Sequence, residues 1–399
     1  MKIAHFADTH FREYGKFEPT YHLHSRTIDY LDSMDMMIDT IIAEEVDIVV
    51  FAGDAFHTHN PNQNLLYLFA ENISKIAQHC PIVMIPGNHD MPGPSYKASS
   101  IDVLSLEIPG VTIANEYKNY MIETKSGNIQ ISAFPFPMRQ HILSEGDLRR
   151  SKKDTWVKYK DEVSKRLQEL SGSLDKSFPS ILIGHFIVSG ASFQARPGML
   201  VDDEVEVNLV ELAEGGWDYV ALGHLHNHQE VFDDPPIVYS GSLDRVSFLD
   251  EHQDKGFVMI DIPEDGEVSW EFISVDARIM VTIDMDVTGT KTPMESIISK
   301  IEEYDVQGAI VRVRIECDSV LYVDKLEVGR KLEEMDMYEL HGISITVPRV
   351  ISSRLDSDRP ASSYTEMEMI EIFFTDTDEE EYEVLENLAE EIMEEVHNE

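Results

Sequence analysis

The feature that most constrains the fold of this chain is a set of five short polar segments, each of which follows an apolar run. The segments contain Asp, His and Asn, and a glycine opens four of them. They are Asp8-Thr9-His10, Gly53-Asp54-Ala55-Phe56-His57, Gly87-Asn88-His89-Asp90, Gly184-His185 and Gly223-His224-Leu225-His226. In open α/β sheets, ligands lie beyond the carboxyl ends of the strands. We therefore expect the five segments to converge on one site, although they come from distant parts of the sequence.

Apolar runs alternate with helical patterns over the first part of the chain. Residues 3–7, 47–52 and 81–85 have the composition of buried strands, whereas 27–45 and 64–78 have helical spacing. Such alternation indicates an α/β layered domain. Further strands are expected at 181–183, 219–222, 237–239 and 257–262, with a hairpin over 120–133. The apolar side of the first helix is expected to contain Leu31, Met34, Ile38, Ile41 and Ile42.

The sequence predicts a first domain over residues 1–275 and a second over 276–351. In the second, strand and helix patterns alternate as in a small α+β domain. The expected order is strand 281–287, helix 293–304, strand 309–315, helix 323–335 and strand 343–350. A polar linker over 352–363 then leads to a last region, 364–399.

The last region is strongly acidic. No Lys or Arg follows Arg359, and fifteen Asp or Glu occur between Ser362 and Glu399. Two interpretations remain open: a solvated acidic tail, or an amphipathic helix that docks in a groove of a partner. The second rests on an apolar stripe at helical spacing, formed by Leu385, Leu388, Ile392 and Val396.

The net charge of the whole chain is −43, from 32 Lys and Arg against 75 Asp and Glu. This balance excludes proteins that bind nucleic acid or anionic lipid through a basic surface alone. General disorder is also excluded, because 42% of the residues are hydrophobic. The densest basic cluster is Arg149, Arg150, Lys152, Lys153, Lys158, Lys160, Lys165 and Arg166. A basic partner or adaptation to high intracellular salt are two explanations for the acidity.

Two cysteines, Cys80 and Cys317, lie far apart and do not suggest a disulfide framework. A reducing, cytoplasmic setting is therefore expected. The first residues resemble a buried strand and not a signal peptide. No apolar stretch is long enough to suggest a membrane-spanning helix.

The residue types of the five segments fit a two-metal phosphoesterase. Imidazole, carboxylate and amide oxygen suit Mn, Fe or Zn, and no cysteine occurs in the segments. Asp54 has two oxygens and can bridge two ions, whereas Asn88 binds an ion without cancelling its charge. Two divalent ions with Asp8 and Asp54 leave a positive centre that attracts a phosphodiester. Each residue alone is weak evidence, because a lone buried histidine is more often a packing residue than a ligand.

At this point the sequence resembles the calcineurin-like metallophosphoesterases, whose signature is these five motifs. More narrowly, it is similar to SbcD-type nuclease subunits of the double-strand-break repair complex. The narrower resemblance covers about residues 1–265 and rests on the residues around the motifs: Asn60-Pro61, Pro92, Tyr239-Ser240-Gly241-Ser242 and Lys255-Gly256. It implies a layered α/β sandwich, a small α+β capping domain and a C-terminal helical tail.

The resemblance also implies roles for individual residues. One metal ion would be held by Asp8, His10, Asp54 and His226, and the other by Asp54, Asn88, His185 and His224. His89 matches the general acid of the family, and His57 matches a histidine that positions or stabilises the scissile phosphate. A structural role is the alternative for His57 and His89. The implied ions are two divalent metals, with Mn²⁺ expected.

The implied activity is that of a Mn-dependent DNA nuclease, both double-strand exonuclease and single-strand endonuclease, which processes DNA ends. The implied partners are DNA, an SMC-like coiled-coil ATPase of the SbcC type that docks on the tail, and a second copy of the chain. The homodimer is expected through helices at 64–78 and 98–107, although ordinary core packing also explains the first. Two alternatives remain: a phosphatase or small-molecule phosphodiesterase of the same superfamily, and a DNA-end-tethering scaffold without catalysis.

Overall fold

The computed structural model describes residues 1–91, 98–149, 151–192 and 204–348, together with Thr365, Glu368 and Ile372. Pro92, Arg150, the expected linker over 352–363 and most of the expected helical tail over 364–399 lie outside the described residues.

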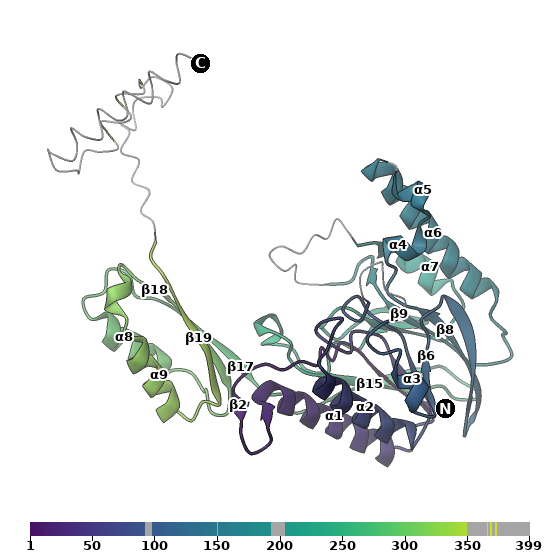
Figure 1. Cartoon of the computed structure of the whole chain (residues 1–399), viewed down its shortest axis with the longest axis horizontal. Coiled ribbons are helices and arrows are strands. Elements are labelled where there is room, and N and C mark those ends of the chain that lie inside the picture. Colours follow the sequence, from purple (N-terminus) through teal and green to yellow (C-terminus); the bar gives the residue numbers. More distant parts are fainter. Residues whose placement is uncertain are drawn as a thin grey trace.

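Two six-stranded sheets form the centre of the larger part (Figure 1). The first sheet has the order β16 (Ser269–Ser274), β15 (Gly256–Asp261), β1 (Lys2–Phe6), β4 (Ile48–Phe51), β5 (Ile82–Met84) and β6 (Val111–Ile113). The second has the order β13 (Gln229–Asp233), β14 (Pro236–Tyr239), β12 (Tyr219–Gly223), β9 (Ser180–His185), β8 (Gly127–Phe134) and β7 (Lys118–Thr124). The strands β1, β4, β5 and β6 run parallel, as do β8, β9, β12 and β14.

The two sheets pack face to face through fully buried aliphatic side chains. Ile48 and Val50 of β4 belong to this inner layer with Ile181 and Ile183 of β9. The intervening Val49 points to the outer face, because successive side chains of a strand alternate between faces. Both faces of these strands are thus covered, which explains their nearly continuous apolar composition.

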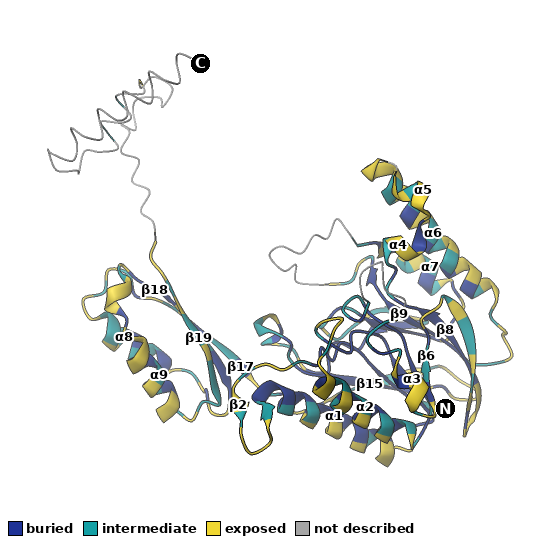
Figure 2. Cartoon of the chain, in the orientation of Figure 1, coloured by how far each residue is buried: buried dark blue, intermediate teal, exposed yellow. Residues whose placement is uncertain are grey.

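Helices cover the outer face of each sheet. The first is covered by α1 (Ser25–Ala43) and α2 (Gln63–Ala77), and the second by α6 (Lys152–Gly172) and α7 (Leu209–Ala213). Figure 2 shows the buried stripe of these helices turned toward the sheets. The layered α/β sandwich expected from the sequence is therefore present. Short elements complete this part: β2 (Phe17–Glu18), β3 (Leu23–His24), α3 (Leu104–Glu107), α4 (Arg139–Ile142), α5 (Glu145–Leu148), β10 (Ile187–Val188), β11 (Glu206–Val207) and a 3-10 helix, η2 (Phe248–Asp250).

Two expectations about helices need correction. Ile42, expected on the apolar side of α1, is 45% exposed, whereas Tyr30 and Met37 are buried. The expected helix over 98–107 is a four-residue helix, α3, that begins only at Leu104.

The second part is a smaller α/β lobe, shown in green in Figure 1. Its three strands, β17 (Met280–Asp286), β18 (Ile310–Glu316) and β19 (Glu339–Thr346), are parallel and lie in that order. Its helices, α8 (Pro293–Ile301) and α9 (Lys325–Glu334), pack on the sheet through a separate apolar core, and η3 (Val320–Tyr322) precedes α9. The last strand begins four residues before the expected position 343, because backbone pairing with β18 starts at Glu339.

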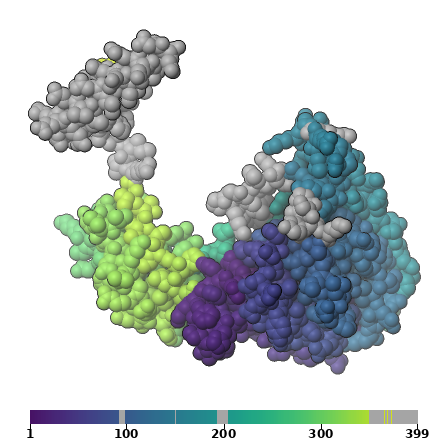
Figure 3. Space-filling model, viewed as in Figure 1, coloured from purple at the N-terminus to yellow at the C-terminus, as the bar shows by residue number. Residues whose placement is uncertain are grey.

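The smaller lobe contacts the N-terminal segment of the larger part. Glu339 accepts hydrogen bonds from the Ser25 hydroxyl at 2.6 Å and from the Lys16 amide at 3.1 Å. The Tyr14 hydroxyl lies 2.8 Å from Nδ1 of His341. Figure 3 shows the lobe against these purple residues, with a hollow above the contact. Among the described helices, none is both long and apolar enough to cross a bilayer.

Candidate metal centre

The five polar segments lie at the carboxyl ends of parallel strands from both sheets. Asp8 follows β1, Asp54 follows β4, Asn88 follows β5, and His185 ends β9. The backbone N–H of Asp8 donates to the carbonyl of Gly53 at 2.9 Å, which ties the first loop to the second. The two sheets thus deliver their loops to the same edge of the sandwich.

Several residues of these loops have left-handed backbone conformations. The φ angles are 52° for Asp8, 43° for His10, 61° for Asp54 and 94° for His224. Non-glycine residues rarely adopt such angles, and strained conformations cluster where function requires them. Gly53 has a φ of 95°, and a Cβ there would collide with the His185 ring. The glycine before Asp54 is therefore required both by the turn and by the close approach of an imidazole.

The first group of candidate ligands is Asp8, His10 and His226. One ligand atom of each lies within 4.8 Å of the others. The Nε2 atoms of His10 and His226 are 2.9 Å apart, and His10 Nε2 is 3.6 Å from Asp54 Oδ2. The ring nitrogens and the carboxylates therefore point at one small volume.

The second group is Asp8, Asp54 and His185, again within 4.8 Å of one another. His185 Nε2 lies 3.4 Å from Asp54 Oδ2 and 3.0 Å from Asn88 Oδ1. His224 approaches the same Asn88 oxygen with Nδ1, at 3.1 Å. Because Oδ2 of Asp54 lies near both His10 and His185, it occupies the position of a bridging ligand. All seven predicted metal ligands are thus brought together, and Asp8 lies near both groups.

Burial and mutual charge strongly perturb this cluster. Burial raises the pKa of Asp8 to about 8. Burial opposes the charge on His185, but the carboxylates of Asp54 and Asp8 raise the pKa of its imidazole to about 9. Burial likewise opposes ionisation of Asp54, but His185 holds the pKa of that carboxyl far below its usual range. The cluster therefore holds protons at neutral pH in a place where divalent cations would displace them.

Three contacts orient the histidines through the ring nitrogens that face away from the other candidate ligands. His185 Nδ1 lies 2.7 Å from the Ala52 carbonyl and donates its proton there, so Nε2, which faces Asn88, is the nitrogen that would bind a metal ion after losing its own proton. His224 Nε2 is 2.9 Å from Glu204, and His226 Nδ1 is 3.7 Å from Asp250. Carboxylates or carbonyls behind the imidazoles are typical of metal-binding histidines. The sequence analysis missed Glu204 and Asp250, because neither belongs to a recognisable motif.

Asp90 braces two of the loops. Its carboxylate accepts N–H bonds from Asp54 at 2.8 Å, Ala55 at 3.1 Å and Gly87 at 3.0 Å. The hydroxyl of Ser100 donates to it at 3.0 Å. Asp90 was part of a predicted segment, but no local pattern indicated that its carboxylate would hold the two loops together.

His89 and His57 lie beside the first group. The backbone N–H of His89 donates to Asp54 Oδ1 at 2.8 Å, and its ring lies 4.8 Å from that of His10. His89 Nδ1 is 2.7 Å from the His57 carbonyl, which directs the other ring nitrogen away from that bond. His57 Nε2 is 3.3 Å from the guanidinium of Arg12. Arg12 was also missed, since a single arginine after the first segment has no distinctive spacing.

The donor set fits two divalent metal ions. Aspartate oxygens, imidazole nitrogens and one amide oxygen converge here, and no cysteine is among these ligands. The ring nitrogens of His185 and His224 that face away from the cluster already contact the Ala52 carbonyl and Glu204. The arrangement therefore suits Lewis-acid hydrolysis of a phosphate ester better than a structural metal site.

Comparison with known proteins agrees with this chemistry. Residues 1–228 match the model of the calcineurin-like phosphoesterase family. The chain is similar in structure to a dimetal phosphatase from Danio rerio, with 13% identity, a TM-score of 0.42, and coverage of 68% of this chain and 99% of that one. It is also similar to the sulfate thiohydrolase SoxB of Thermus thermophilus, with 11% identity, a TM-score of 0.37, and coverage of 68% and 56%. The family match over residues 1–228 shows that the chain belongs to the calcineurin-like phosphoesterases, a family of hydrolases that bind two divalent metal ions.

Proposed function

We propose that the protein is a Mn²⁺-dependent DNA nuclease, acting as a double-strand exonuclease and single-strand endonuclease on DNA ends in double-strand-break repair. Two of the residues that carry the SbcD-type resemblance, Ser242 and Lys255, support this, because they contact the backbone of His226 in the candidate metal centre. Lys255 Nζ donates to the His226 carbonyl at 2.9 Å and to the Ser242 hydroxyl at 2.8 Å. The backbone of Ser242 also donates to the His226 carbonyl, at 3.1 Å.

In this proposal, Asp8, His10, Asp54 and His226 hold one ion, and Asp54, Asn88, His185 and His224 hold the other. When bound, the two ions generate hydroxide and stabilise charge on the phosphate. His89 donates a proton to the leaving sugar oxygen through the ring nitrogen that is not directed at the His57 carbonyl. His57 and the guanidinium of Arg12 position the scissile phosphate from one side.

The observation that carries the proposal is the contact between the metal centre and the smaller lobe. Arg12 lies against His57, its guanidinium stacks 4.7 Å over the Tyr14 ring, and Tyr14 contacts His341 of the lobe. A substrate bound at the centre therefore lies at the junction of two lobes. That position suits a polymer that contacts both lobes, which is the role expected of a capping domain.

The decisive experiment measures Mn²⁺-dependent cleavage of end-labelled duplex DNA by the protein together with its ATPase partner. His89→Ala is expected to lower the rate by at least about 100-fold while Mn²⁺ binding survives, because a general acid contributes that much. His59→Ala is the matched control, since His59 is exposed and close in sequence. Cleavage at the full rate in the presence of a chelator, or by His89→Ala, contradicts the proposal.

A phosphatase or small-molecule phosphodiesterase is the second candidate, and the net charge of −43 favours it, since an acidic surface repels DNA. Rapid turnover of a cyclic nucleotide or a phosphomonoester, without DNA cleavage in the presence of the ATPase, decides for this candidate. The intact donor set disfavours a tethering scaffold without catalysis.

We also propose a homodimer through α2 and α3. A mostly apolar cavity of about 230 Å³ lies between these helices and is lined by Leu66, Tyr67, Val103 and Leu104. Tyr67 is 65% exposed and Leu106 of α3 is 80% exposed, so large apolar side chains face solvent beside it. Such a patch is typical of an interaction surface.

The SMC-like ATPase of the SbcC type remains a proposed partner, docking on a tail that lies outside the described residues. A cytoplasmic location is proposed on the evidence of two free, buried cysteines, Cys80 and Cys317.

A further inference from the structure

A cavity of about 460 Å³ lies beside the candidate metal centre, where its lining residue Phe136 is next to His224. Phe136 separates the two: its ring lines the cavity and lies nearly parallel to the His224 ring, at an angle of 29° and a centroid distance of 6.2 Å. Met91, the next residue after the bracing Asp90, also lines it. The volume lies within the range of small-ligand sites.

The cavity has an apolar side and a polar side, and the polar side contains Asn115, Glu116 and His141 as well as Lys118 and Arg166. The apolar side is formed by Met91, Pro135 and Phe136, with the Tyr117 ring next to them. Arg166 of α6 stacks its guanidinium 4.8 Å over the Tyr117 ring, and its Nε is buried without a hydrogen-bond partner in the part of the chain that the structure describes. Lys118 at the rim is already paired with Glu116 at 2.6 Å, so Arg166 is the stronger candidate to meet an anion.

The basic residues near the cavity depart sharply from the charge of the whole chain. Residues 149–166 hold eight Lys or Arg and three Asp or Glu, a net charge of +5 within a chain of −43. Most of them lie on α6, the helix that also carries Arg166. Arg139 of α4 stacks on Trp156 of this helix at 4.9 Å, which extends the basic and aromatic surface away from the cavity.

On the basis of the proposed function, we propose that this cavity binds the nucleotide adjacent to the scissile phosphate in an unpaired DNA strand. The base stacks on Phe136, Arg166 binds the phosphate beyond it, and the strand continues along α6. Aromatic rings next to cationic groups are the usual means of holding single-stranded nucleic acid, because every base has a π face and every linkage an anion. Such a site takes one strand, so the end of a duplex would have to be unpaired there before the metal centre cleaves it.

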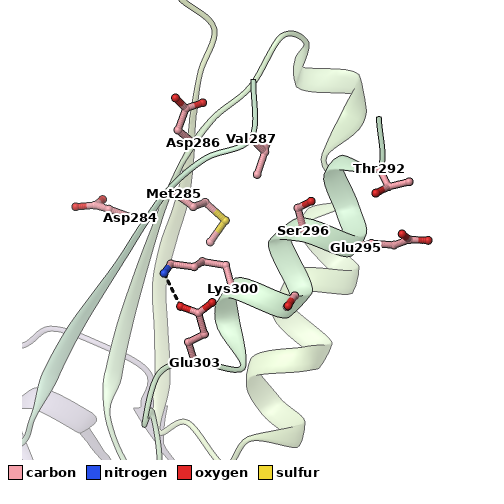
Figure 4. Close-up of a pocket in the computed structure, with 10 residues that line it drawn as sticks. Asp284, Met285, Asp286, Val287, Thr292, Glu295, Ser296, Lys300 and Glu303 are labelled. Carbon is pink, nitrogen blue, oxygen red and sulfur yellow. Dashed lines mark hydrogen bonds and ion pairs between the residues drawn. The ribbon is translucent and has the colours of Figure 1, made fainter. Parts of the chain in front are cut away.

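A cavity in the smaller lobe does not suit such a ligand. It measures about 570 Å³, lies between β17 and α8, and has Met285, Ser296, Lys300 and Glu303 among its lining residues (Figure 4). Its basic lining residue, Lys300, is paired with Glu303. None of its described lining residues is aromatic and its lysine is already paired, so the cavity beside Phe136 is the one that fits a nucleotide.

The test compares two substrates under Mn²⁺. One is a short single-stranded oligonucleotide, and the other is bis(p-nitrophenyl) phosphate, which has no neighbouring nucleotide. For Arg166→Gln, the ratio of kcat/KM for the oligonucleotide to that for the small diester is expected to fall about tenfold, mainly through KM. Arg166→Lys retains the charge without the planar guanidinium, and its ratio of kcat/KM values is expected to lie between those of the wild type and Arg166→Gln. Lys165→Gln is the control, because Lys165 is exposed, pairs with Glu169 and does not line the cavity.

The outcomes separate this proposal from the nuclease proposal. If the wild type cleaves the oligonucleotide and Arg166→Gln changes the ratio no more than Lys165→Gln, the cavity proposal is wrong and the nuclease proposal stands. If the wild type hydrolyses the small diester but neither binds nor cleaves the oligonucleotide with its ATPase present, both are wrong. Binding is measured by fluorescence anisotropy of a labelled oligonucleotide with Ca²⁺ in place of Mn²⁺.

Discussion

His10 and His226 are separated by 216 residues in the sequence, yet their Nε2 atoms lie 2.9 Å apart. Two neutral imidazoles cannot both point lone pairs at each other at this distance without repulsion. A proton or a cation must therefore lie between them. Asp8 and Asp54 are close by, so a divalent ion is the cation that matches the charge of the surroundings.

This pair gives the first prediction. His226→Gln is expected to remove one of two Mn²⁺ ions per chain, because it withdraws an imidazole from the first group. Each bound ion should add about 3 kcal/mol of stability at a Mn²⁺ concentration 100 times its Kd, so the variant should gain about half of what the wild type gains. Isothermal titration counts the ions and thermal unfolding with and without a chelator measures the gain. The exposed His252→Gln is the control, and equal stoichiometry in the two variants contradicts the assignment.

The second prediction concerns pH. Without metal, the pKa of Asp8 is about 8 and that of His185 is about 9, so both groups are mostly protonated at pH 7. Both must lose their protons to bind an ion. Affinity should therefore fall as the pH drops through 9 and 8, by up to about tenfold per pH unit for each displaced proton. Titrations at pH 7 in buffers of different ionisation enthalpy should reveal the release of one to two protons, and identical heats in all buffers would refute this.

The third prediction concerns Glu204, which contacts the outer nitrogen of His224 at 2.9 Å. Glu204→Gln removes the charge but keeps the size, and is expected to weaken Mn²⁺ binding at the second group about tenfold. Glu206→Gln is the matched control, because Glu206 is two residues away and exposed. Mn²⁺ affinity is measured by electron paramagnetic resonance of the free ion. A Glu204→Gln variant that binds both ions like Glu206→Gln excludes the role in orienting His224.

The candidate metal ligands that the structure brings together were predictable from the sequence, whereas the residues that orient those ligands were not. Asp54 and Asn88 stand out because each follows an apolar strand and a glycine, which is a local pattern. Glu204 and Asp250 act only through an imidazole from another strand, and no local pattern records that contact.

The fold, too, has features that were predictable from local sequence patterns and features that were not. The β4 strand was visible in its continuous apolar run, but the side of α1 that is buried was misjudged at Ile42. Periodicity gives an approximate face of the helix, and the packing of Tyr30 and Met37 of α1 into the core decides where that face ends. The start of β19 was misplaced because its first residues, Glu339 and His341, are polar and contact the other lobe. Contacts across more than 300 residues determine that strand, and a window of neighbouring residues cannot report them.

The fourth prediction tests the link between the lobe and the metal centre. Tyr14 supports the Arg12 guanidinium with its ring and contacts His341 with its hydroxyl. Tyr14→Ala removes both contacts and is expected to lower kcat for DNA about fivefold, the value of one cation–π contact. Tyr14→Phe keeps the ring and should lower it less. Mn²⁺ stoichiometry is the accompanying measurement, and loss of metal in Tyr14→Ala would show a general structural defect instead of misplacement of Arg12.

The fifth prediction concerns the proposed homodimer. Tyr67 of α2 lines the apolar cavity shared with α3 and is 65% exposed. Tyr67→Glu places a carboxylate in this surface, and burying an unpaired charge in an interface is costly, so the variant should be monomeric where the wild type is dimeric. Tyr21→Glu is a close control, because Tyr21 is also 65% exposed but lies away from the cavity. Sedimentation equilibrium measures the mass of each variant. If Tyr67→Glu and Tyr21→Glu dimerise equally well, the interface lies elsewhere; if only Tyr67→Glu is monomeric, the exposed apolar side chains of α2 and α3 form the contact.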